Sequence, residues 1–147
     1  MRRAVLLSLA LLLAGPTPSA FSQGQPPHAW LFGTWMGGLF PPPTSLTTQA
    51  CFSQPVVIFT RDLVMRATLT DQTLVQRVIE SARAVPNGAE FRFAAPAAMP
   101  RMFGGGDVPQ VGFGCATPND LTVQRRGENE IVFPGCPEFP YPLVRCH

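Results

Sequence analysis

The amino-acid sequence predicts a mainly β protein, a small antiparallel meander barrel or sandwich of seven to nine short strands stapled by two disulfides. Apolar runs of strand length recur between turn motifs, which is typical of hairpin-connected sheets. The 147 residues include 17 prolines and 13 glycines, and this frequency suits short strands better than long helices. Four cysteines follow an N-terminus with the features of a secretory signal, which favours disulfides over free thiols.

An export signal is predicted at the N-terminus. Two arginines precede an apolar run over residues 4–14, which ends in a proline-containing stretch before the small residues Ala20 and Ser22. We expect cleavage after Ser22, so that residues 1–22 are a signal peptide and the mature chain is periplasmic or secreted. The apolar run is shorter than the ~20 residues that a spanning helix needs. No second long apolar segment follows, so we expect no membrane insertion of the mature chain.

Removal of the signal leaves 125 residues (147 − 22), which is enough for one domain. We expect a flexible leader over 23–29 and a single β-rich domain over 30–147. All 11 basic residues are arginines, and the nine that follow the signal balance nine acidic residues. A formally neutral chain lacks the basic face that nucleic-acid binding requires, so a nucleic-acid partner is not expected.

The first predicted strands lie in the N-terminal half of the domain. Residues 31–36 form an aromatic-rich strand, residues 56–60 are a β-branched run, and residues 63–70 alternate. The three residues 60–62 predict a tight hairpin between the second and third of these strands. In the third strand, one face is formed by Leu63, Met65, Ala67 and Leu69.

Residues 72–85 fit two structures. Leu74, Val75, Val78, Ile79 and Ala82 follow a helical stripe, whereas alternate residues from Val75 onward fit one face of a long strand. The following Pro-Asn-Gly sequence is a strong hairpin signal, and residues 89–93 alternate as a strand would. We therefore favour a strand that pairs with 89–93, and a helix over 72–84 is the alternative.

The C-terminal half contains a predicted loop and four more strands. Residues 94–108 are rich in proline, alanine and glycine, as in a loop. A turn at 126–129 predicts a second hairpin, with Val123 opposite Val132. The remaining predicted strands are 111–115, 121–125, 130–133 and 142–146.

The four cysteines allow three disulfide pairings. Cys115 and Cys136 flank the base of the second hairpin, which predicts a bridge between them. Cys51 would then pair with Cys146 and tie an early segment to the last strand, as closure of a barrel requires. A zinc site is not expected, because there is no Cys-x-x-Cys pair and the two histidines lie near the ends of the sequence. We expect no metal and no cofactor.

A Gly-x-Trp motif on the first predicted strand, at Gly33 and Trp35, resembles that of lipocalin-like proteins and of small periplasmic protease inhibitors built on a similar barrel. In lipocalins this tryptophan closes one barrel end under an arginine from near the last strand. The resemblance implies the same structural role for Gly33, Trp35 and Arg145. The wider pattern over 30–43 and 121–146 also looks like exported proteobacterial families of unknown function.

The first function hypothesis is a non-enzymatic exported binding protein. A ligand cavity or apolar patch is expected near Trp30, Trp35 and Phe40, for a small apolar ligand or an unknown protein partner. An exposed loop could instead insert into a partner's cleft, as in protease inhibitors. The residues of this partner loop are Gly104, Gly105, Gly106 and Asp107.

The second hypothesis is a small envelope hydrolase that uses carboxylates such as Asp62, Asp107 or Asp120. A serine or cysteine hydrolase is not expected, because His28 and His147 are poorly placed to be held by packing as a catalytic base. A purely structural envelope component is the remaining alternative. We expect the non-enzymatic binding protein and assign no catalytic residues.

Overall fold

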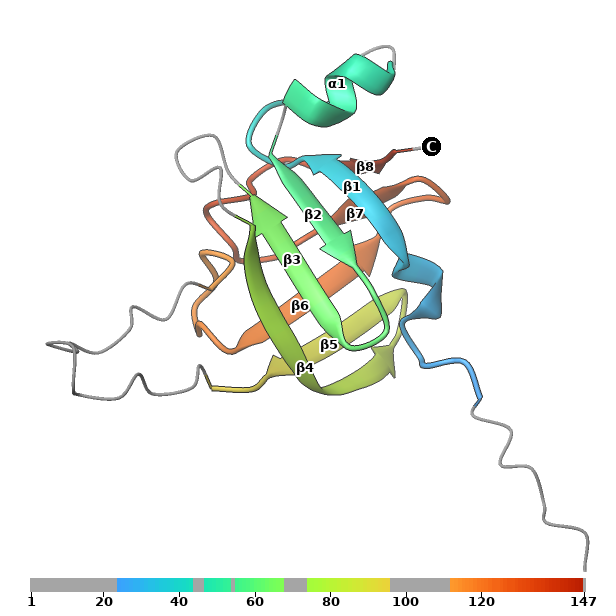
Figure 1. The fold of residues 1–147 in the computed structure, drawn as a ribbon, viewed down its shortest axis with the longest axis vertical. Helices are drawn as coiled ribbons and strands as arrows, with labels where there is room; N and C mark the ends of the chain where they lie inside the picture. The colour runs from blue at the N-terminus through green and yellow to red at the C-terminus, as the bar shows by residue number, and fades with distance from the viewer. Residues whose placement is uncertain (1–23, 44–46, 54, 68–73, 96–111, 147) are drawn as a thin grey trace, which may run out of the picture.

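Eight antiparallel strands close into one barrel in a computed structural model that describes residues 24–43, 47–53, 55–67, 74–95 and 112–146. Each strand pairs with the next along the chain and β8 pairs with β1, so the barrel is a closed meander (Figure 1). This confirms the predicted fold class. The strands are β1 (Gly33–Gly37), β2 (Val56–Phe59), β3 (Leu63–Ala67), β4 (Val75–Val85), β5 (Gly88–Phe93), β6 (Asp120–Arg125), β7 (Glu130–Val132) and β8 (Leu143–Arg145).

The ambiguous segment is the long strand β4, so the alternative of a helix over 72–84 is wrong for its described residues. A tight turn at Pro86 and Asn87 pairs Val85 with Gly88 and brings β4 directly beside β5. Asn87 has a φ of 59°, which asparagine tolerates in turns better than most residues do. The pairing that this turn creates outweighs the helical periodicity, because it provides partners for the backbone of β4.

Gly88, at the start of β5, leaves no room for a side chain. A Cβ atom there would overlap the carbonyl oxygen of Val123 on β6 and lie 3.3 Å from the Cα of Gln124. We expect Gly88→Ala to lower the free energy of unfolding by about 1–3 kcal/mol, because β5 and β6 must move apart. Denaturant unfolding measures the change. Gly127→Ala is the control, because nothing lies within 4 Å of a Cβ at that turn glycine, and equal effects at the two positions would contradict the prediction.

The second hairpin has a register that differs from the prediction by one residue. Val132 pairs with Gln124 rather than with Val123. The amide of Arg126 donates to the carbonyl of Glu130 at 2.9 Å, so the hairpin closes there and its loop is one residue shorter than expected. This register places Val123 and Ile131 in the core, both fully buried, as the two-residue period of strands requires.

Two other predicted strands differ from the structure. The strand expected over 31–36 begins only at Gly33, because Ala29–Leu31 form the 3-10 helix η1. The described part of 111–115 is irregular rather than a strand. Gly114 has a φ of 63°, and this turn conformation interrupts extended backbone.

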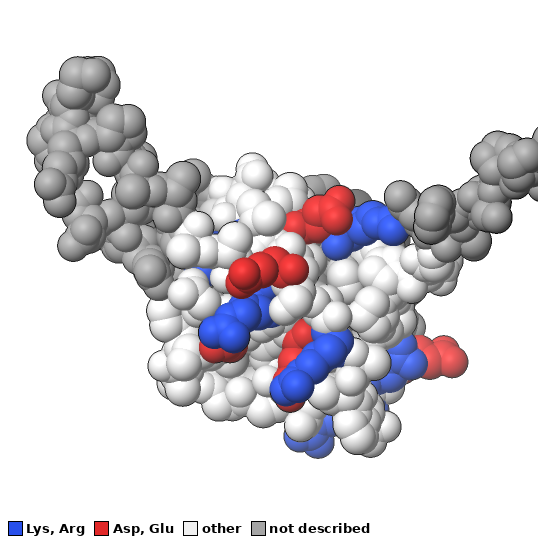
Figure 2. Space-filling model, turned by 90° about the horizontal axis from the view of Figure 1, so that it is seen from below, with Lys and Arg blue, Asp and Glu red and all other residues white. Residues whose placement is uncertain are grey.

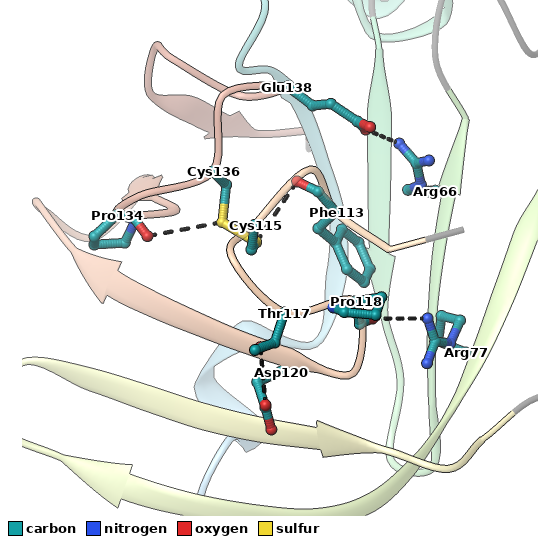
Figure 3. The surroundings of a disulfide bond; sticks show 10 residues. All are labelled: Arg66, Arg77, Phe113, Cys115, Thr117, Pro118, Asp120, Pro134, Cys136 and Glu138. Carbon is teal, nitrogen blue, oxygen red and sulfur yellow. Dashed lines mark hydrogen bonds and ion pairs between the residues drawn. A yellow bond between two sulfur atoms is a disulfide. The ribbon is translucent and has the colours of Figure 1, made fainter. Parts of the chain in front are cut away.

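Both predicted disulfides are present. Cys51, in the short helix α1 (Thr48–Ser53), is bonded to Cys146, the residue after β8, with Cα atoms 6.0 Å apart. Cys115 is bonded to Cys136, which joins the β5–β6 connection to the β7–β8 connection (Figure 3). Neither described helix is long and apolar enough to cross a membrane.

The two ends of the barrel are unlike each other. At one end, tight turns at 60–62, 86–87 and 126–129 join the strands; we call this the tight-turn end. The strands β1, β3, β5 and β7 end at the opposite end of the barrel, and we call this the long-loop end. η1 packs at the tight-turn end, where Nε2 of the preceding residue, His28, donates to the carbonyl oxygens of Thr60 and Arg61 in the β2–β3 turn.

Candidate functional site

A continuous column of aromatic side chains fills the barrel interior. His28 contacts Phe91 at the tight-turn end, with ring centroids 5.1 Å apart. Phe91 stacks on Phe93 at 6.2 Å, and Phe93 contacts Phe113 at 5.4 Å. Phe113 then reaches Phe139 at the long-loop end, and all four phenylalanines are buried. An eight-stranded barrel is just wide enough for its own side chains or for one small ligand, and here the rings occupy that space.

Trp35 and Arg145 close the tight-turn end. Trp35 is fully buried and its Nε1 donates to the carbonyl of Leu31 at 2.8 Å. The Arg145 guanidinium lies 4.3 Å from the Trp35 ring centroid and donates to the carbonyls of Phe32 and Trp30. Cation–π contact and charge-assisted hydrogen bonds together hold η1 against the barrel. The expected contact of Arg145 with Trp35 is therefore present, and both residues are structural here.

The three predicted ligand residues do not surround one cavity. Trp35 belongs to the core, and the ring of Trp30 is covered by the Arg125 guanidinium at 4.1 Å. Phe40 lies after β1, at the long-loop end, and is 48% exposed. Tyr141 is also exposed there, and its amide donates to the carbonyl of Gly38. A cavity shared by Trp30, Trp35 and Phe40 is thus a wrong expectation, because the first two residues pack at the opposite end.

His28 was expected in a flexible leader, and for this residue the expectation is wrong. Its side chain is only 2% exposed, and its Nε2 lies 3.2 Å from the carbonyl oxygens of both Thr60 and Arg61. Its Nδ1 is buried without a hydrogen-bond partner among the described residues. Sequence spacing gave no sign of this packing, because its partners lie more than 30 residues away.

Asp62 and Asp120, the two predicted carboxylates that the structure describes, do not form a pair. Asp62 lies in the β2–β3 turn, whereas Asp120 begins β6 and accepts a hydrogen bond from Thr117. The strands β4 and β5 lie between these two positions in the barrel. Asp107 and the partner-loop residues Gly104, Gly105 and Gly106 lie outside the described residues. Among the described residues, no three metal-ligating acidic, histidine or cysteine side chains gather.

Two arginines point into the barrel at the long-loop end. Arg66 on β3 and Arg77 on β4 are neighbours on the inner face of paired strands, and they are 6% and 4% exposed. Arg77 donates to the carbonyl of Pro118 at 2.9 Å and to Oδ1 of Asn119 at 2.6 Å. Burial, and after it the charge of Arg66, lowers the pKa of Arg77. An arginine still remains a cation at neutral pH. Two positive charges therefore lie side by side at the long-loop end of the barrel interior, which we call the barrel mouth.

Glu138 reaches this mouth from the β7–β8 connection and forms an ion pair with Arg66 (Figure 3). The exposed fractions of the two side chains are unequal, 45% for Glu138 and 8% for Arg66. Glu138 lies across Gly114, where a Cβ atom would overlap its side chain. The disulfide between Cys115 and Cys136 fixes the two connections that carry this contact. The two disulfide-linked connections therefore cover the barrel mouth.

The outer surface of β2 and β3 is apolar, and Val78 on β4 extends it. The inward residues of β2 and β3 are buried, so the alternate residues face outward and are partly exposed. Ile58 pairs with Met65 and Leu63 pairs with Val78, which is 53% exposed. In Figure 1, no described segment lies in front of β2 and β3. We call the following residues the outer apolar face: Val56, Ile58, Leu63, Met65, Ala67 and Val78.

The face of the molecule that is seen from below differs from the outer apolar face. The view from below shows basic and acidic side chains interspersed, with no region of a single sign (Figure 2). An open groove of about 430 Å³ lies beside β6 and β7, and its lining includes Arg126, Pro134, Pro137 and Pro140. Val132, Phe133 and Phe139 also line this groove, so it mixes apolar and polar residues, whereas the outer apolar face has no polar residue.

Comparisons with protein-family models, curated proteins and solved structures found no match for this chain. Function is therefore inferred from the geometry of the barrel alone. The Gly33–Trp35 motif stays a resemblance. The alternation of residues 63–70 predicts only three residues of the outer apolar face, Leu63, Met65 and Ala67, and alternation does not say which face of a strand points inward. The contacts of Arg66 with Glu138 and of Arg77 with Asn119 show which face points inward.

Proposed function

We propose that this chain is an exported, non-enzymatic binding protein that engages a protein partner through the outer apolar face. The observation that carries the proposal is the composition of that face. Every outward residue of β2 and β3 is apolar, whereas the outer face of an antiparallel sheet normally alternates to polar residues. A contiguous exposed apolar patch on a folded domain is typical of an interaction site.

The chemistry of the face indicates the chemistry of its partner. No charged side chain faces outward from β2 or β3, and the flanking positions are the uncharged Thr34 and Gln76, which pair laterally with Ile58 and Met65. A partner surface with a buried charge would lose its solvation without gaining a counter-charge. The complementary surface is therefore apolar and uncharged at its centre. A disulfide-stapled barrel adds rigidity, so little conformational entropy is lost on binding.

A small apolar ligand inside the barrel is the less favoured form of this hypothesis, because phenylalanine rings fill the described interior. The hydrolase alternative is not supported by Asp62 and Asp120, its two described candidates, because β4 and β5 lie between them. Export agrees with the signal-like N-terminus and with two disulfides, which persist in oxidising compartments. We therefore propose that the protein is periplasmic or secreted.

Photo-crosslinking from the outer apolar face tests the proposal. A photoreactive amino acid replaces Val78 or Met65 in the full chain, which is expressed and irradiated in its own source cells. We expect one protein to be crosslinked from both positions. The same residue at Tyr141, which is 42% exposed at the long-loop end, is the matched control and should give no such adduct.

A charge on the face then tests whether binding depends on it. We expect Val78→Glu to reduce the adduct formed from position 65 by about tenfold or more, because the partner would have to desolvate a carboxylate. Thermal unfolding should be nearly unchanged, since residue 78 is exposed. Tyr141→Glu should leave the adduct intact. Adducts from position 141 alone, or between two copies of this chain, would contradict a partner at this face.

A further inference from the structure

We propose that Arg66 anchors a carboxylate-binding site in the barrel mouth, in which Glu138 is a resident carboxylate that an incoming carboxylate replaces. This site is separate from the outer apolar face, because Arg66 points inward from β3 and that face points outward. The proposal therefore stands or falls independently of the partner proposed above.

The first support is the way in which Arg66 is held. Its guanidinium carbon lies 5.9 Å from the ring centroid of Phe113, and its side chain is 8% exposed. Its Nε is buried and has no hydrogen-bond partner among the described residues. A buried donor that is left unpaired is costly and calls for a partner, which a bound ligand would supply. Arg66 therefore has one carboxylate contact, to Glu138, and donor capacity beyond it.

The second support is the unequal burial of the two ion-pair partners. Arg66 cannot leave the mouth without opening the core, whereas 45% of the Glu138 side chain is already in water. Only the side chain of Glu138 has to turn outward, so the connection that the disulfide fixes can stay in place while the barrel stays closed. An incoming carboxylate would restore the charge contact that Glu138 gives up, so the exchange does not leave the buried guanidinium of Arg66 unpaired.

The third support is the chemical selectivity of the site. A guanidinium presents a planar set of donors that fits the two oxygens of a carboxylate. Arg77, hydrogen-bonded to Pro118 and Asn119, adds a second positive charge beside it. Gly114 leaves the space that the side chain of Glu138 now occupies. The ligand is thus a carboxylate group, either of a free small acid or of a peptide.

The Nε–H resonance of Arg66 in ¹H–¹⁵N spectra provides a direct readout. Acetate is titrated into the wild-type protein and into Glu138→Gln, with chloride at equal ionic strength as reference. We expect a saturable shift in both, at about tenfold or more lower acetate concentration in the variant, because the resident carboxylate is gone. Glu90→Gln is the matched control, since it removes the partner of Arg83 in an ion pair on the barrel surface and should behave as wild type.

Peptide arms distinguish the two sources of the carboxylate. A short peptide with a free C-terminal carboxylate is compared with acetate and with the same peptide as its amide. Tighter binding of the free peptide than of acetate assigns the site to a peptide, and equal binding assigns it to small acids. An amide that binds as well as the free acid overturns the proposal. A shift that stays linear with acetate in the wild type also overturns it, even if the variant does not fold.

Discussion

Cys146→Ser, combined with Cys51→Ser to avoid a stray thiol, is expected to lower the free energy of unfolding by about 4 kcal/mol. The bond joins residues 95 positions apart. Its loss therefore raises the conformational entropy of most of the unfolded domain. It also ties α1 to the residue that follows β8, which pairs with β1. In the chain-entropy account, long closed loops are the most stabilising.

Denaturant unfolding under oxidising conditions measures this change. The matched control is the pair Cys115→Ser and Cys136→Ser, whose bond closes a loop of only 21 residues and should cost about 1 kcal/mol less in the same account. An unchanged unfolding midpoint after loss of the long-range bond would show that the β1–β8 pairing needs no covalent support.

Trp35→Ala is expected to lower the free energy of unfolding by about 3–5 kcal/mol. The ring is fully buried, and its loss leaves a cavity at the tight-turn end. The substitution also removes the cation–π partner of Arg145 and the hydrogen bond to Leu31. Because one residue supports three contacts, the loss should exceed that of an ordinary core truncation.

Trp35→Phe separates these contributions. It keeps an aromatic face for Arg145 but removes the indole donor, so we expect a loss of about 1–2 kcal/mol, between the wild type and Trp35→Ala. Tyr141→Ala, at an exposed ring, should change stability by less than about 0.5 kcal/mol. Thermal and denaturant unfolding of the three variants provide the measurement. Equal losses for the two Trp35 variants would mean that the hydrogen bond, rather than the ring, dominates.

The strands could be predicted wherever alternation and turn chemistry agree. Residues 63–67 alternate after a tight turn, and residues 89–93 alternate after Pro86 and Asn87; both segments are strands. The disulfide pairing also followed from the hairpin geometry. These features are local, or depend on one hairpin at a time, so the order of residues along the chain contains the necessary information.

The candidate sites could be predicted only in part. Leu63 and Met65 stood out as one face, but their exposure depends on Arg66, which faces inward to meet Glu138, 72 residues later. Arg77 likewise meets Asn119 across 42 residues. Such contacts depend on how two connections fold over the barrel mouth, and no periodic pattern encodes them. Arg66 and Arg77 are charged residues that face inward, against the usual pattern of polar residues outside. Such exceptions to local patterns are expected at functional sites.

Pairing of β1 with β8 sets the order of events as the chain emerges. Trp35 on β1 lies opposite Arg145 on β8. During synthesis β1 can therefore pair with β8 only after more than 100 later residues have been made. Until then the sheet is open, with two unpaired edges, and such intermediates are prone to pair with other chains. The topology of the barrel therefore exposes the chain to aggregation during folding, until β8 pairs with β1.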